Sequence, residues 1–165
     1  MESKLKKRLL YLLLSVIGLT MLFILTNSLR PPEESMEQSD SALGFIGMLF
    51  SPEKPFGAFL QEYGRKIAHF AEYGLLGAEV AILVNFYLQK RKMMAVLSVP
   101  LAMCFAVIDE TLQYFSGRGP AILDVWIDLG GFLTLSLFTY GFIFALTKIK
   151  YRLRHRAEQT EITDG

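Results

Sequence analysis

Four long apolar runs dominate the pattern of hydrophobic and polar positions along the chain. They cover residues 9–29, 67–88, 93–114 and 122–147. A helix needs about 20 mainly apolar residues to cross the hydrocarbon layer of a bilayer, and each run reaches that length. The sequence therefore predicts an all-α membrane protein, a four-transmembrane-helix bundle formed by a single domain over residues 1–165.

The distribution of basic residues predicts how this bundle is oriented. Lysine and arginine concentrate in residues 4–8, 90–92 and 148–156, and are sparse in the other two connections. Loops rich in these residues stay on the cytoplasmic side. We therefore expect both termini in the cytoplasm, a long extracellular loop over residues 30–64 and a cytoplasmic tail over residues 148–165. The first run is longer than the about 7–15 apolar residues of a signal peptide, so we expect a retained anchor helix.

The segments between and beside the runs carry weaker signals. The apolar piece Leu43–Phe50 is too short to span, and is predicted to lie in the membrane interface or over the mouth of the bundle. Phe56–Tyr63 is predicted as a second short interfacial helix. A surface loop with scattered apolar residues is the alternative for both. Glu158–Gly165 is predicted to be disordered, Pro100 to kink the third helix, and Cys104 to be a small core residue.

Polar and charged residues stand where these apolar helices should carry none. They are Arg65, Lys66, His69 and Glu72 in the second segment, Asp109, Glu110 and Gln113 in the third, and Arg118, Asp124 and Asp128 around the start of the fourth. A charge inside hydrocarbon costs at least about 2.5–3.5 kcal/mol. The predicted orientation brings all three groups to the outer leaflet. We expect them to meet one another or to line an outward-facing polar cavity.

Helical spacing places these residues on shared faces, because positions three or four apart lie on one side of a helix. The pairs and stripes are Arg65–His69–Glu72, Asp109–Gln113, Glu110–Gln113 and Asp124–Asp128. The first stripe continues through Leu76 to Glu79, for which the sequence indicates no partner at the same depth. Gly130 and Gly131 are predicted to allow close approach of another helix.

The charge balance of the cluster leaves several kinds of chemistry open. Five acids (Glu72, Asp109, Glu110, Asp124, Asp128) face three fixed cations (Arg65, Lys66, Arg118) and His69. One interpretation is a salt-bridge network that only fastens the helices, with Tyr73 and Gln113 satisfying spare acceptors. The acid surplus favours protonation, a bound cation or an amine-bearing ligand.

Three functional interpretations follow from the same residues. His69, Glu72, Asp109 and Glu110 are candidates for general acid–base catalysis. Asp109, Glu110, Asp124 and Asp128 are candidates for holding a divalent cation, the one cofactor that the sequence suggests. Arg65, Lys66 and Arg118 are candidates for binding a lipid phosphate. The further candidate ligand-binding residues are Tyr73, Gln113, Asp124 and Asp128. A net charge of +1 gives no case for a nucleic-acid partner.

Three segments of the chain resemble the VanZ-like family of membrane proteins. They are RKIAHFAEYGLLG (65–77), DETLQYFSGRG (109–119) and DVWIDLGG (124–131). The resemblance implies a small four-helix protein of the bacterial plasma membrane. It also implies functional roles for Lys66, His69, Phe70, Glu72, Tyr73, Gly77, Asp109, Glu110, Gln113, Arg118, Asp124 and Asp128. Phe70 and Gly77 are added by the resemblance alone. Asn27–Ser28 and Ser35 are weak counterparts of a serine-containing segment common in the family.

The namesake of that family is associated with low-level teicoplanin resistance in Gram-positive bacteria. We therefore expect a cell-envelope protein that lowers teicoplanin susceptibility by binding or modifying an outer-leaflet cell-wall lipid or the drug. Its expected partners are the bilayer and a lipid-linked cell-wall precursor or glycopeptide. The alternatives are a membrane-embedded hydrolase or transferase acting on a phosphate-bearing polyprenyl lipid, and a structural scaffold. Whether the protein is an enzyme stays open.

Overall fold

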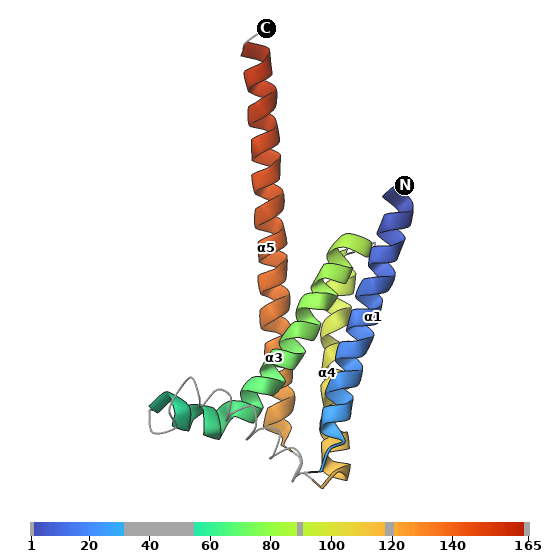
Figure 1. The fold of residues 1–165 in the computed structure, drawn as a ribbon, viewed down its shortest axis with the longest axis vertical. Helices are drawn as coiled ribbons and strands as arrows, with labels where there is room; N and C mark the ends of the chain where they lie inside the picture. The colour runs from blue at the N-terminus through green and yellow to red at the C-terminus, as the bar shows by residue number, and fades with distance from the viewer. Residues whose placement is uncertain (1, 32–54, 89–90, 118–120, 164–165) are drawn as a thin grey trace.

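The computed structural model describes residues 2–31, 55–88, 91–117 and 121–163, which are almost entirely helical (Figure 1). The helices are α1 (Glu2–Ser28), α3 (Pro55–Tyr87), α4 (Arg91–Phe115) and α5 (Ile122–Thr163). Each contains a stretch long and apolar enough to cross a membrane: Lys4–Ser28, Tyr63–Tyr87, Arg91–Phe115 and Ile122–His155. The prediction of an all-helical chain with four candidate membrane spans is therefore confirmed.

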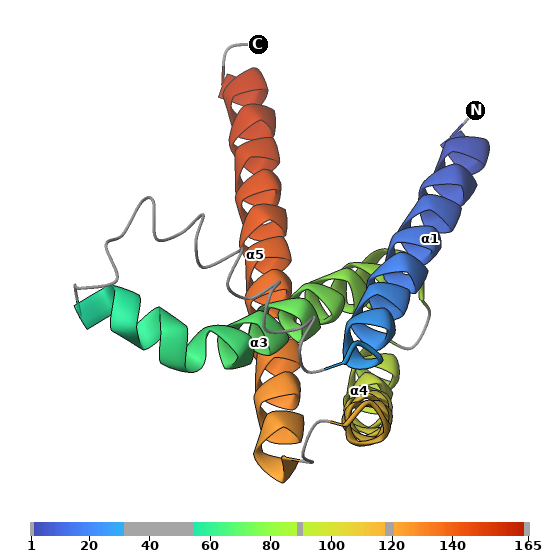
Figure 2. The ribbon, with the colours of Figure 1, turned by 60° about the horizontal axis from the view of Figure 1, so that its bottom comes forward.

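The helices alternate in direction, so that both termini lie at the same end of the bundle (Figures 1 and 2). The end of α1, the end of α4 and the start of α5 lie together at the opposite end. An even number of spans requires this arrangement. Which end faces the cytoplasm stays a prediction from the basic residues.

Two helices extend beyond the apolar runs that predicted them. The stretch Phe56–Tyr63, predicted as a separate helix, forms the first turns of α3, which begins at Pro55 and projects sideways from the bundle (Figure 1). Proline favours the first position of a helix. The predicted disorder from Glu158 is wrong, because α5 continues to Thr163. Charged residues with high helix propensity prolong a helix that is already nucleated. The predicted interfacial piece 43–50 lies outside the described residues.

One face of α4 is buried and the opposite face points outward. Ala102, Phe105 and Ala106 lie on the buried face, and α4 runs through Pro100 without ending. Cys104 lies on the outward face and is exposed, so the prediction of a core cysteine is wrong. An apolar residue in a spanning helix can face lipid as readily as the core, because both surroundings are apolar.

Helices α3 and α5 form the most extensive contact in the bundle, and glycines set how closely they pack. A Cβ atom at Gly77 would lie 2.2 Å from the carbonyl oxygen of Phe132, and one at Gly131 would lie 2.2 Å from that of Phe70. Both distances are too short for any side chain. Ser136 adds a hydrogen bond to the Gly77 carbonyl oxygen at 2.9 Å. The predicted close approach is confirmed at Gly131, whereas Gly130 has room for a Cβ atom.

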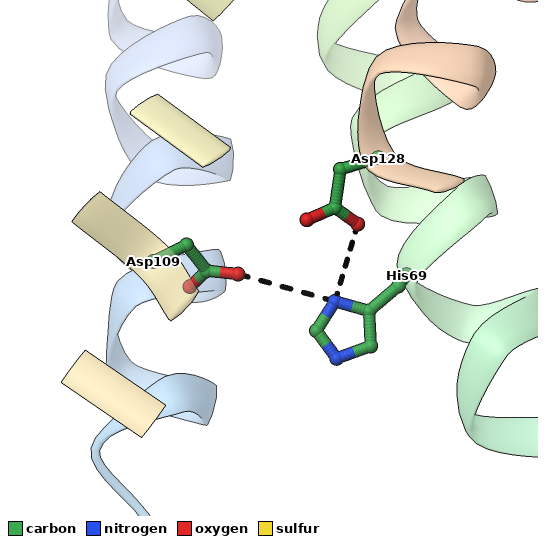
Figure 3. Close-up of side chains that lie close together, drawn as sticks. All are labelled: His69, Asp109 and Asp128. Carbon is green, nitrogen blue, oxygen red and sulfur yellow. Dashed lines mark ion pairs between the residues drawn. The ribbon is translucent and has the colours of Figure 1, made fainter. Parts of the chain in front are cut away.

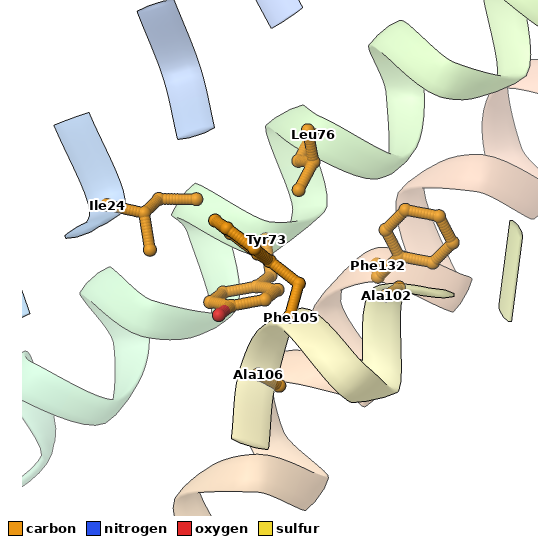
Figure 4. Close-up of a cluster of buried hydrophobic side chains, with 7 residues drawn as sticks. All are labelled: Ile24, Tyr73, Leu76, Ala102, Phe105, Ala106 and Phe132. Carbon is orange, nitrogen blue, oxygen red and sulfur yellow. The ribbon is translucent and has the colours of Figure 1, made fainter. Parts of the chain in front are cut away.

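The apolar core lies where all four described helices meet (Figure 4). Its members are Ile24, Tyr73, Leu76, Ala102, Phe105, Ala106 and Phe132. The rings of Tyr73 and Phe105 pack with their centroids 5.9 Å apart. Tyr73 follows His69 by one helical turn, and Ala106 precedes Asp109 by one turn. The core therefore supports the polar residues from the side of the bundle interior.

Candidate functional site

Three buried side chains from three helices converge near the end of the bundle where α1 and α4 end. They are His69 of α3, Asp109 of α4 and Asp128 of α5, which we call the His–Asp–Asp cluster (Figure 3). The Nδ1 atom of His69 lies 3.3 Å from Oδ1 of Asp128 and 3.9 Å from Oδ2 of Asp109. His69 is 8% exposed and the two aspartates are fully buried. One nitrogen or oxygen atom from each of the three side chains lies within 4.8 Å of the other two.

Uncharged donors from α1 and α4 complete the surroundings of Asp109. The Ser28 hydroxyl donates to Oδ1 of Asp109, and the Gln113 amide donates to Oδ2 at 3.2 Å. Ser116 in turn donates to the Ser28 carbonyl oxygen at 2.9 Å. These bonds fix the orientation of the carboxylate within the cluster. They also confirm the predicted shared face of Asp109 and Gln113.

Glu72 connects the cluster with the side of the bundle. The Asn27 amide donates to Oε1 of Glu72 at 3.2 Å, so this contact joins α1 to α3. Glu72 also lines a lateral groove of about 280 Å³ between these helices, together with Leu19, Thr20, Phe23 and Leu75. The groove is therefore apolar along most of its wall, with a carboxylate one helical turn from His69.

Glu79 has a partner that the sequence did not indicate. The Thr20 hydroxyl of α1 donates to Oε1 of Glu79 at 2.9 Å. Thr20 and Asn27 are seven residues apart, which puts them on one face of α1. Two polar residues at this spacing in an apolar helix indicate a polar helix face. This pattern could have predicted that α1 has polar contacts with another helix.

Two of the predicted acids fasten helix ends and lie outside the His–Asp–Asp cluster. Asp124 is buried and its Oδ2 lies 3.8 Å from Arg65, whose side chain is 51% exposed. Glu110 accepts a hydrogen bond from the backbone N–H of Ala121, directly before α5. Of the four acids predicted to hold a cation, the structure groups Asp109 and Asp128, and it adds His69 in place of Glu110 and Asp124.

The remaining predicted residues occupy different surroundings. Tyr73 is fully buried in the core, and Lys66 lies with its Nζ 5.7 Å from the centre of the Tyr63 ring. Phe70 contacts Gly131 through its backbone. Arg118 lies outside the described residues.

Several buried polar atoms in and beside the cluster have no hydrogen-bond partner within the part of the chain that the structure describes. They are Nδ1 of His69, both carboxylate oxygens of Asp128 and the hydroxyl of Tyr73. Most buried polar groups in proteins are hydrogen-bonded. The ion-pair contact with His69 offsets part of the cost of burying Asp128. A bound ligand could make the hydrogen bonds or metal bonds that these atoms lack.

Comparison with known proteins gives one match. The sequence profile of the VanZ/LLP1 family matches residues 9–146, which include the whole His–Asp–Asp cluster. The comparisons with curated proteins and with solved structures found no match. The chain thus belongs to the VanZ/LLP1 family and is a multi-pass membrane protein of a family linked to glycopeptide resistance.

Proposed function

We propose that this protein lies in the bacterial plasma membrane and lowers susceptibility to teicoplanin. It does so by binding or modifying an outer-leaflet lipid-linked cell-wall component, or the drug itself. The observation that carries this proposal is the His–Asp–Asp cluster, which three spans bury at one end of the bundle. The basic residues predict that this end faces outward, where cell-wall lipids and glycopeptides are found.

The lateral groove supports a lipid-bearing ligand. Leu19, Phe23 and Leu75 give it an apolar wall, and Glu72 adds a carboxylate near the cluster. An acyl or polyprenyl chain fits an apolar wall that faces the bilayer. Its polar head then meets Glu72, one helical turn from His69. Teicoplanin carries an acyl chain, so the drug meets the same requirement as a lipid.

A purely structural role for the cluster is less well supported. A network that only fastens helices is expected to satisfy its buried acceptors, since an unsatisfied buried group costs about 1–3 kcal/mol. Both oxygens of Asp128 lack a hydrogen-bond donor among the described residues. Other contacts perform the fastening, namely Asp124 with Arg65 and Ser136 with Gly77, while Glu110 uses one of its two oxygens for the N–H of Ala121.

The proposal is tested by expressing the chain in a susceptible Gram-positive host. The minimum inhibitory concentration of teicoplanin is measured against an empty-vector strain, with vancomycin alongside. A rise for teicoplanin that exceeds the rise for vancomycin is the expected result. Equal values for the two strains at a confirmed membrane level of the protein would contradict the proposal.

A second candidate function is hydrolysis or group transfer on a phosphate-bearing polyprenyl lipid. His69 lies between two carboxylates, an arrangement suited to proton transfer. The purified protein is incubated with a polyprenyl phosphate, and released phosphate and the lipid product are quantified. Turnover that His69→Gln abolishes identifies an enzyme, whereas a binding protein returns the lipid unchanged.

A further inference from the structure

The His–Asp–Asp cluster combines the donor types of a transition-metal site. It offers one imidazole nitrogen and two carboxylates, each from a different helix. Zinc sites that bind a substrate or water use three protein ligands of these types and leave a fourth position open. A local sequence motif for zinc is missing here because α3, α4 and α5 each contribute a single ligand.

The spacing of the donor atoms suits a small cation. A tetrahedral site with metal–ligand bonds of about 2.0–2.1 Å has ligand–ligand edges of about 3.3 Å. The distance from Nδ1 of His69 to Oδ1 of Asp128 is 3.3 Å, and that to Oδ2 of Asp109 is 3.9 Å. The widest separation in the group is within 4.8 Å. Binding of the cation would draw the more widely spaced donor atoms together.

The unsatisfied atoms point to a ligand independently of these distances. Asp128 is fully buried, yet neither of its oxygens has a hydrogen-bond donor among the described residues. Nδ1 of His69 also has no hydrogen-bond partner there. The Tyr73 hydroxyl, one turn along α3 from His69, is equally buried and lacks a partner there as well. A bound cation would satisfy the first three atoms. A water or other oxygen ligand on that cation would suit the Tyr73 hydroxyl.

Surrounding residues orient the ligands as in known metal sites. Ser28 and Gln113 both donate to Asp109 from outside the cluster. Hydrogen bonds of this kind hold a metal-bound carboxylate in its orientation. Two carboxylates and a neutral imidazole also balance the charge of a divalent cation. Such balance offsets the cost of burying two acids side by side.

We propose that His69, Asp109 and Asp128 bind one divalent transition-metal cation of the Zn²⁺ class. The imidazole disfavours Mg²⁺ and Ca²⁺, which prefer oxygen ligands throughout. The inference rests on the proposed function in treating the cluster as the working part of the protein. In addition, the bound cation would coordinate a phosphate or carboxylate oxygen of the ligand.

Metal binding to the purified protein tests the inference. The protein is prepared without a polyhistidine tag, stripped with a chelator, and titrated with Zn²⁺ against a chromogenic competitor. Parallel titrations use Mg²⁺ and Ca²⁺. His155→Gln in the parent background removes the second histidine of the chain. We expect one Zn²⁺ per chain in this background, bound at least 100-fold more tightly than Mg²⁺ or Ca²⁺.

Variants identify the ligands. Asp128→Asn and His69→Gln are each expected to weaken Zn²⁺ binding at least tenfold. Glu79→Gln is the matched control for Asp128→Asn, because it makes the same acid-to-amide change at a buried carboxylate that lies on α3 outside the cluster. It is expected to bind within twofold of the parent. No stoichiometric Zn²⁺ in the parent, or equal weakening in the control, would overturn the inference.

A spectroscopic measurement decides the case if the cluster variants fail to fold. Cu²⁺ replaces Zn²⁺ in the His155→Gln protein, and electron spin-echo spectroscopy reports nitrogen nuclei near the metal. We expect the signal of a single imidazole, and its absence would overturn the inference. Loss of metal binding with retained teicoplanin protection refutes the metal site alone. Stoichiometric metal binding without protection refutes the proposed function alone.

Discussion

Nδ1 of His69 lies 3.3 Å from Oδ1 of Asp128, and a backbone contact beside these residues sets that distance. Phe70 follows His69 directly, and its carbonyl oxygen lies 2.2 Å from the position that a Cβ atom of Gly131 would take. Gly131 is three residues beyond Asp128 on α5. The glycine therefore allows α3 and α5 to approach closely enough for the histidine and the aspartate to meet.

Replacing Gly131 by alanine should destabilise the bundle. The new Cβ atom would lie 2.2 Å from the Phe70 carbonyl oxygen, so the helices must separate. Overpacking of this kind costs about 1–3 kcal/mol. Thermal unfolding of the purified protein in detergent measures the effect as a lower apparent Tm.

Gly141→Ala on the same helix is the control, because nothing lies within 4 Å of the added atom. Alanine is the better helix former by up to about 1 kcal/mol, so this variant should be as stable as the parent or more so. Equal losses in the two variants would show that close packing at Gly131 does not hold the helices.

The sequence was sufficient to predict the spans and most of the polar cluster. Length and hydropathy identify the spans, and a spacing of four residues put Asp109 with Gln113, as their hydrogen bond confirms. The sequence did not predict that α3 begins at Pro55 or that α5 continues to Thr163. A search for apolar runs of bilayer length does not detect the parts of a helix that extend beyond the hydrocarbon layer.

Contacts between helices were harder to predict. Thr20 and Ser28 of α1 meet Glu79 and Asp109, but the register of one helix against another depends on packing that sequence spacing does not encode. For the same reason Glu110 was grouped with Asp109 as a cation ligand. In the structure it accepts a hydrogen bond from the Ala121 backbone instead.

The bond between Thr20 and Glu79 should contribute a measurable coupling energy. The two residues join α1 to α3 at a separation of 2.9 Å. Hydrogen bonds between membrane helices average about 0.6 kcal/mol and reach about 1.7 kcal/mol in double-mutant cycles. We expect a value in this range from Thr20→Val, Glu79→Met and the double variant, by unfolding in detergent, since neither substituted side chain can make this hydrogen bond. Strictly additive losses would mean that the contact contributes nothing to stability.

Filling the lateral groove should reduce protection against teicoplanin without loss of protein. Leu75→Trp places a larger side chain on the wall between α1 and α3, where the proposed lipid chain lies. Leu137→Trp is the matched control, because Leu137 is an exposed leucine of α5 that does not line the groove. We expect at least a fourfold lower inhibitory concentration for the first variant alone. If both variants protect equally at equal membrane levels, the groove is not the route of the ligand.

Both termini should face the cytoplasm. Fusion of a fluorescent protein that matures only in the cytoplasm is expected to give fluorescence at either terminus. Fusion of an alkaline phosphatase that is active only outside is expected to give no activity at either. The basic residues in the first turns of α1 and in the last third of α5 are the reason for this expectation. An active phosphatase fusion at either terminus would place the His–Asp–Asp cluster on the cytoplasmic side and remove the basis of the proposed function.

The most direct test of the central claim is the teicoplanin inhibitory concentration of an Asp128→Asn strain, compared with the parent at matched membrane levels of the protein. The substitution keeps the size of the side chain and removes the charge that faces His69. The Glu79→Gln strain controls for the loss of a buried carboxylate as such. We predict that Asp128→Asn falls to the empty-vector value while Glu79→Gln protects like the parent. Full protection by Asp128→Asn would contradict the claim that the His–Asp–Asp cluster is the functional site.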